Sequence, residues 1–194
     1  MKHASSRELF DYWSGLRGAA PAPERSEIEP SAIRRALGDV FILAFDRQAG
    51  HPFRLAGTRV CALFGRELRN ESFLAVWDPA SRMALGELMA AVCDETVGAV
   101  AGVNASTAEG WNQEIELLLL PLRHCGEIHA RVIGVLAPLT IPFWLGAARL
   151  TRLTLGTVRH LDPVLEGPPA ARLLPGAQSD RQHGIFVVHE GGRR

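Results

Sequence analysis

The sequence predicts an α+β domain in which antiparallel strands flank a helical segment. The expected order along the chain is two strands, then helices, then three strands. Runs of strands around a helical insert favour this class over alternating βαβ units. The chain has 194 residues, and 47% of them are hydrophobic. This length suits one domain with extensions, and the apolar content is sufficient for a substantial core.

The first expected element is an amphipathic helix over residues 5–16. Its apolar residues Leu9, Phe10, Trp13 and Leu16 are spaced three to four apart, so they share one helical face. The following segment, 18–23, is rich in Gly, Ala and Pro and is typical of a linker. We therefore divide the chain into an N-terminal helix with its linker (1–23), the domain (24–161) and a mostly disordered tail (162–194) with a short apolar segment at 184–189.

The domain is expected to open with a short helix headed by Pro30, followed by strands over 40–45 and from Phe53. The turn-rich segment between these two strands predicts a hairpin. The last expected segment, 150–161, contains Thr, Val and Gly, which favours extended structure.

Two helices follow the hairpin. Thr58 is a candidate N-cap for the first one, and Gly65 is expected to end it in a left-handed conformation. Gly57 is likewise expected to be required by the backbone. Asp78 is expected to cap the longer helix, with Pro79 at its first position, where no amide hydrogen is needed.

Three further β segments are expected over 97–105, 112–122 and 128–139. The middle one carries Glu114 and Glu116 on one face, followed by a run of leucines. The alternation of these two glutamates is typical of a face that meets water, although a carboxylate pair on one face could also serve a small enzyme.

Several motifs, in this order and spacing, resemble a bacterial PAS-like family known as a domain of unknown function. The matching segments are 12–13 (Tyr-Trp), 54–58 (RLAGT), 64–68 (FGREL), Trp77, 118–121 (LLLP) and 144–146 (WLG). The resemblance implies a five-stranded antiparallel sheet with helices cupped over one face. In PAS domains generally, the concavity holds a cofactor or metabolite, or side chains close it while the outer face of the sheet binds another domain.

The resemblance implies a stand-alone sensory or adaptor module without enzymatic activity. It would bind a small, largely apolar ligand in the cup, or a protein partner, and signal by altered protein contacts. The alternative is a ligand-free structural interaction module, and a third class is a small enzyme that uses Glu114 or Glu116. The pocket candidates come from elements that face one another across a PAS cup: Phe41, Leu55, Val60, Phe64, Trp77, Leu88 and Leu119.

Cofactors known from other PAS domains are disfavoured here. The reactive-cysteine stretch of light-sensing flavin domains (Asn-Cys-Arg-Phe-Leu) is missing, and the long helix over 79–96 has no histidine that could serve as an axial haem ligand. His124, Cys125 and His129 could hold zinc only with a fourth ligand, and residues on a hairpin turn diverge. We therefore expect no metal site.

Partners follow from charge and from the N-terminal helix. The formal net charge is zero, which argues against binding to nucleic acid or to a membrane surface. The apolar face formed by Leu9, Phe10, Trp13 and Leu16 needs a surface to cover it, and we expect it to contribute to a homodimer. Three scattered cysteines and the lack of a signal peptide or an apolar span predict a cytoplasmic protein.

Overall fold

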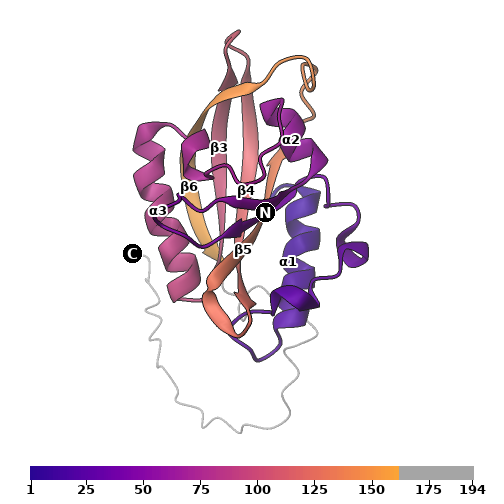
Figure 1. Ribbon diagram of the computed structural model, residues 1–194. Helices are drawn as coiled ribbons and strands as arrows, with labels where there is room; N and C mark the ends of the chain where they lie inside the picture. The colour runs from indigo at the N-terminus through magenta and orange to yellow at the C-terminus, as the bar shows by residue number, and fades with distance from the viewer. Residues whose placement is uncertain (162–194) are drawn as a thin grey trace, which may run out of the picture.

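The computed structural model describes residues 1–161 (Figure 1). The predicted disordered tail and its apolar segment at 184–189 lie outside the described residues. The elements, in chain order, are α1 (Ala4–Arg17), the 3-10 turns η1 (Arg25–Glu27) and η2 (Pro30–Ile33), β1 (Val40–Ala44), β2 (Phe53–Ala56), α2 (Thr58–Phe64), η3 (Leu74–Val76), α3 (Pro79–Asp94), β3 (Gly98–Thr107), β4 (Asn112–His124), β5 (Glu127–Pro138) and β6 (Leu150–Leu161).

The strands form one antiparallel sheet in the order β2-β1-β5-β4-β3-β6. The predicted α+β class is confirmed, with one strand more than the five expected. The additional strand is β6, in the segment predicted to be extended, and it pairs along the whole of β3. Long strand pairs of this kind satisfy the backbone groups of an edge segment whose side chains alternate only weakly.

Both faces of the sheet are covered by helices. Helices α2 and α3 and the turn η3 pack on one face, which we call the cup, and α1 packs on the other, which we call the outer face. Figure 1 shows α1 and α3 at opposite sides of the strands. In β4 the leucines alternate, so that Leu117 and Leu119 enter the cup while Leu118, Leu120 and Leu122 face outward. The uninterrupted leucine run is the pattern of a strand buried on both faces.

The start of α3 agrees with the sequence prediction, but the start of α2 does not. The carboxylate of Asp78 accepts hydrogen bonds from the amides of Ala80 (3.0 Å) and Ser81 (3.2 Å). In α2 the N-cap is Gly57, and Thr58 makes no capping bond, so the predicted Thr58 cap is wrong. The carbonyl of Gly38 takes that role, because it accepts from the Arg59 and Val60 amides at 2.9 and 3.1 Å.

Gly57 and Gly65 are both required by the backbone, for different physical reasons. A Cβ on Gly57 would collide with the carbonyl oxygens of Leu37 and Gly38, the second of which caps α2. Gly65 has φ 64° and ψ 23°, the left-handed conformation expected of a residue that ends a helix. By contrast, Gly86 lies within α3, and apart from the adjoining residues and backbone of its own helix no atom lies within 4 Å of the position that its Cβ would occupy.

These three glycines make a matched set for unfolding experiments. We expect Gly65→Ala to cost about 1 kcal/mol from the strained backbone, and Gly57→Ala to cost roughly 1–3 kcal/mol from overpacking against backbone. The control Gly86→Ala should stabilise the protein by about 0.5–1 kcal/mol, because alanine favours a helix interior. Urea unfolding measures all three. An unchanged midpoint for Gly57→Ala would contradict the close approach of Gly38 to α2.

Candidate functional site: a filled cup and a covered outer face

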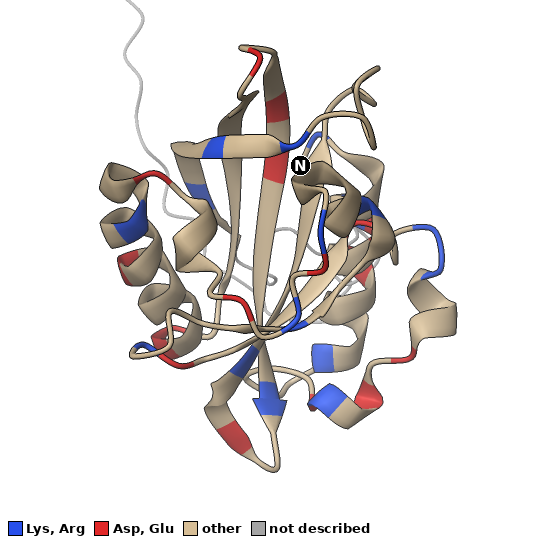
Figure 2. Ribbon diagram, turned by 45° about the horizontal axis from the view of Figure 1, so that its top comes forward, with Lys and Arg blue, Asp and Glu red and all other residues tan. Residues whose placement is uncertain are grey.

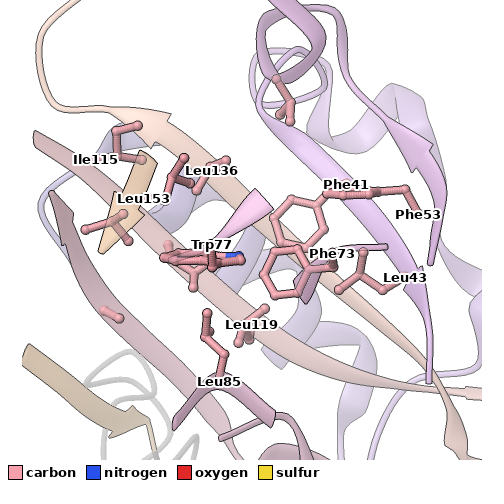
Figure 3. Close-up of a cluster of buried hydrophobic side chains, with 14 of the residues drawn as sticks. Phe41, Leu43, Phe53, Phe73, Trp77, Leu85, Ile115, Leu119, Leu136 and Leu153 are labelled. Atoms are coloured by element: carbon pink, nitrogen blue, oxygen red, sulfur yellow. The ribbon is translucent and has the colours of Figure 1, made fainter. Parts of the chain in front are cut away.

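The cup is the first candidate site, and it collects almost all of the predicted pocket residues. Leu55 is the exception. The others are buried together in one cluster, shown in part in Figure 3: Phe41, Val60, Phe64, Trp77, Leu88 and Leu119. Their side chains pack against one another, so the structure brings them together as a core. Whether they line a ligand pocket stays a prediction.

Leu55 is 44% exposed, so its predicted place in the cup is wrong. The reason is the register of β1 with β2, which is regular as far as the pair Ile42 and Leu55. The irregularity between Ile42 and Leu43 comes after this pair and brings Phe53 into the cup. Leu55 pairs with Ile42, whose side chain belongs to the outer face, whereas Phe53 pairs with Leu43, which lies in the cup. Because directly paired residues share a face, Leu55 points away from the cup.

Interlocking aromatic rings fill the middle of the cup. The ring centroids of Phe41 and Phe73 are 5.6 Å apart, those of Phe53 and Phe73 are 5.7 Å apart, and those of Phe41 and Phe53 are 5.8 Å apart. Trp77 continues the cluster at 5.7 Å from Phe73. Phe53 and Phe73 were not among the predicted lining residues. Phe73 lies in the loop that follows the helix ended by Gly65, and an aromatic residue in that loop was the signal that could have identified it as a cup residue.

Trp77 carries the one unsatisfied polar group within this cluster. Its side chain is buried, and its Nε1 has no hydrogen-bond partner among residues 1–161. Figure 3 shows the indole nitrogen on the side of the ring that faces Phe73. A buried donor without an acceptor costs about 1–3 kcal/mol. The cup therefore contains one position at which an acceptor would be stabilising.

The outer face is the second candidate site, and α1 covers it. Leu9, Phe10 and Trp13 are buried against β4 and β5, and Leu16 is partly buried. The indole Nε1 of Trp13 donates a 2.8 Å hydrogen bond to the Pro121 carbonyl. The residues predicted as an interface thus contact the sheet of their own chain. In one predicted form of the homodimer, the apolar faces of two α1 helices pack on each other; the burial of this face against the sheet contradicts that form. In the other form, two chains exchange their α1 helices, and this form remains a prediction.

Glu116 fastens the beginning of α1 to the sheet. Its side chain accepts hydrogen bonds from the backbone amides of Lys2 (2.5 Å) and His3 (2.9 Å), and the residue is 5% exposed. The expectation of a water-facing pair with Glu114 is wrong for Glu116, because the N-terminal segment passes over it. Glu114 is exposed. Burial raises the pKa of Glu116, but the hydrogen bonds to its carboxylate and the positively charged N-terminus together outweigh burial, so the pKa lies below its ordinary value.

Asp39 makes a second buried connection, which the sequence interpretation missed. It is 1% exposed, and its carboxylate binds the Arg59 guanidinium through two hydrogen bonds of 2.6 and 2.7 Å. The Ser5 hydroxyl donates to the same carboxylate at 2.6 Å. The carboxylate of Asp39, the residue just before β1, is thereby bonded to both α1 and α2. No motif marks Asp39, because its partners are far away in the sequence.

Among the described residues, no three or more His, Cys, Asp or Glu side chains come together in a way that could hold a metal ion. His129 contacts Asp94 at 2.7 Å, and Cys125 is exposed in the turn between β4 and β5. Burial raises the pKa of the Cys61 thiol, and it raises that of Cys93 to about 12. Both thiols are therefore protonated near neutral pH and act as small apolar groups. Within residues 1–161 no helix is long and apolar enough to span a membrane.

Solved structures similar to this chain are light-sensing and PAS proteins. An RNA-binding light-oxygen-voltage receptor aligns at 16% identity with a TM-score of 0.44, over 61% of this chain and 36% of the receptor. The LOV domain of the blue-light photoreceptor Aureochrome1, in its light state, aligns at 14% identity with a TM-score of 0.42, over 57% of this chain and 88% of that one.

A PAS domain of an HTR-like protein from Haloarcula marismortui aligns at 16% identity with a TM-score of 0.38, over 56% of this chain and 90% of that one. No curated protein sequence matches the chain.

A family model is more informative than these distant structures. The model of a PAS domain family matches residues 1–137, from α1 through most of β5. This range contains the cup helices, the aromatic cluster and both buried carboxylates. It confirms the family suggested by the ordered motifs, and the chain belongs to this PAS domain family.

Proposed function

We propose that this PAS domain is an adaptor that works through contacts on its surface, without catalysis and with its cup filled by its own side chains. PAS domains commonly serve as sensory or interaction modules, and the packed aromatic rings are the observation that favours the second role. Three phenylalanine rings and one indole lie within 6 Å of a neighbour, measured between centroids. Close packing of this kind leaves little space for a ligand unless side chains move.

Glu114 and Glu116, the two carboxylates considered for catalysis, do not form a paired site. Glu116 is occupied by backbone amides, and Glu114 is exposed on the same face. A general acid or base must be free to exchange a proton with the substrate, and the carboxylate of Glu116 is already held by the Lys2 and His3 amides. This arrangement supports a non-enzymatic role.

A small ligand in the cup is the second candidate function, and the unpartnered Trp77 N–H favours it. A ligand with an apolar body and one acceptor atom would satisfy this donor. Binding would require displacement of part of the aromatic cluster. Such a movement would couple occupancy of the cup to α2 and α3, which pack over it.

Native mass spectrometry of the purified full-length protein distinguishes the two functions. We expect a mass that is accounted for by polypeptide without any bound small molecule, because the cup is filled. A small uncharged molecule retained under native conditions and lost on denaturation would contradict the filled cup. In that case Trp77→Phe, which removes only the N–H and part of the ring, should weaken retention, whereas Trp111→Phe on the exposed surface should not.

An exchange of α1 between two chains is our proposal for a homodimer. The exchanged helix would make the same contacts as in one chain, including the Trp13 bond to Pro121, and a two-fold arrangement would leave no face uncovered. We expect the full-length protein to contain a dimer in solution by light scattering. A chain that begins at Glu24 should lose that dimer and expose apolar residues of the outer face. A strictly monomeric full-length protein over a wide concentration range would contradict the exchange.

The Glu116 contact predicts a specific dependence of stability on pH. Because the pKa of Glu116 is lowered in the folded state, its contribution is present above the ordinary glutamate pKa of 4.5 and is lost as pH falls through the lower folded value. Glu116→Gln should therefore cost roughly 1–2 kcal/mol at neutral pH, and the difference from the natural chain should shrink in acid. Urea unfolding at several pH values measures this.

The control for this experiment is Glu114→Gln, on the same face of the same strand but exposed. It should change stability little at any pH. Equal effects of the two substitutions would contradict the assigned role of Glu116.

A further inference from the structure

An open pocket of about 800 Å³ lies at the edge of the cup, on the outer side of its core cluster. Its walls come from the residues after α2, from the segment joining η3 to α3, and from the beginning of β6. Three of its lining residues, Phe64, Trp77 and Leu150, are at most 3% exposed and form an apolar floor continuous with the core. A pocket of this volume is within the range of small-molecule sites.

The rim of this pocket is strongly cationic. Four arginines line it, namely Arg66, Arg82, Arg149 and Arg152. Among the described lining residues the only acid is Asp78, whose carboxylate is engaged by the Ala80 and Ser81 amides and by the Ser81 hydroxyl. Figure 2 shows basic segments at the start of β6 and in the first half of α3 on the same side of the molecule. This concentration of positive charge occurs in a chain whose formal net charge is zero.

The four guanidinium groups differ in how far they are already neutralised. Arg66 is paired with Glu71 through hydrogen bonds of 2.8–3.1 Å. Arg82 donates to two backbone carbonyls, at 2.9 Å for Trp77 and 3.4 Å for Ala75, which orients the group but leaves its charge uncompensated. Arg149 lies near Glu109, which is outside the pocket.

Within residues 1–161, Arg152 makes no side-chain hydrogen bond or ion pair. Arg82 and Arg152 therefore retain charge that a bound anion can satisfy.

The pocket walls are fixed relative to one another by hydrogen bonds between α3 and β6. The Asp78 amide donates to the Leu153 carbonyl at 3.0 Å. The Leu155 amide donates to the Ser81 hydroxyl oxygen at 2.8 Å. These bonds hold the backbone that carries Arg82 beside the backbone that carries Arg152. A site whose backbone is held in place before binding loses less entropy when the ligand arrives.

We propose that this arginine-rimmed pocket binds a small organic anion, with its apolar body on the Phe64–Trp77–Leu150 floor and its phosphate or carboxylate group against the guanidinium groups of Arg82, Arg149 and Arg152. Guanidinium forms paired, charge-assisted hydrogen bonds with both kinds of anion. The apolar floor selects molecules with a hydrophobic part over inorganic ions. The pocket shares this floor with the cup cluster but opens outward from it. An anion can therefore bind there without displacing the packed rings, and the proposal does not depend on the proposed adaptor function.

The test uses three aromatic probes with the same ring system and different head groups: naphthyl phosphate, naphthoate and neutral naphthol. Each is titrated into the full-length protein by calorimetry, and backbone amide shifts in NMR spectra locate the binding site. We expect at least one of the two anions to bind roughly tenfold or more tightly than naphthol, with shifts concentrated in residues 75–82 and 149–154. A comparison of the phosphate with the carboxylate identifies the preferred head group.

Matched double variants separate a site from general attraction to positive charge. Arg149→Gln with Arg152→Gln should weaken binding of the preferred anion by roughly tenfold, while Arg34→Gln with Arg54→Gln removes two exposed arginines outside the pocket and should leave it unchanged. The proposal is overturned if neither anion binds better than naphthol, if both double variants weaken binding equally, or if the shifts map to another region. Thermal unfolding of each variant checks that the fold is retained.

Discussion

The sheet of this protein is apolar on both of its faces, and the rest of the fold depends on covering it. The constraint is clearest in β4, where alternate leucines belong to the cup and to the outer face. Each face exposes enough apolar surface that leaving either uncovered would be costly at about 25 cal/mol per Å². The chain meets this requirement with α2, η3 and α3 on the cup side and with α1 on the outer side. Helix α1 is thus a structural part of the domain.

Two buried carboxylates determine where α1 sits. Apolar contact alone is non-directional and would allow α1 to slide along the sheet. Glu116 binds the backbone just before the helix, while Asp39 binds Ser5 within its first turn. Asp39 also binds Arg59 in α2. Because a buried carboxylate without partners is strongly destabilising, these bonds favour one position of α1 and connect the outer face to a helix of the cup. Displacement of α1 would therefore be felt in α2.

The periodicity of the sequence predicted most of the fold, since apolar spacing and turn residues depend on local geometry. The helix predicted over residues 5–16, the cap at Asp78 and the helix end at Gly65 all follow from residues within a few positions of one another. The motifs predicted the family because their residues and their order along the chain can be read directly from the sequence. The cup residues other than Leu55 followed from the expected positions of those elements.

The errors arose where distant segments meet. The carbonyl of Gly38 replaced Thr58 as the cap of α2, and the pairing of Leu55 with Ile42 placed Leu55 on the face away from the cup. Glu116 was expected to meet water because the path of residues 1–3 over the sheet has no signature in its own sequence. The sequence interpretation missed Asp39 and the arginine-rimmed pocket for the same reason. Their residues come from segments whose proximity is created only by the folded sheet.

Native-state hydrogen exchange tests most directly the claim that α1 is an integral part of the domain. Amides in the middle of α1 and amides in the centre of β4 are compared in the full-length protein under conditions where exchange reports opening free energies. If α1 closes the outer face, its most protected amides should exchange with nearly the same opening free energy as those of β4. For both sets of amides this value should equal the free energy of global unfolding. If α1 amides instead exchange through a much smaller opening while β4 stays protected, the helix is a loosely attached appendage and the account given for the outer face is wrong.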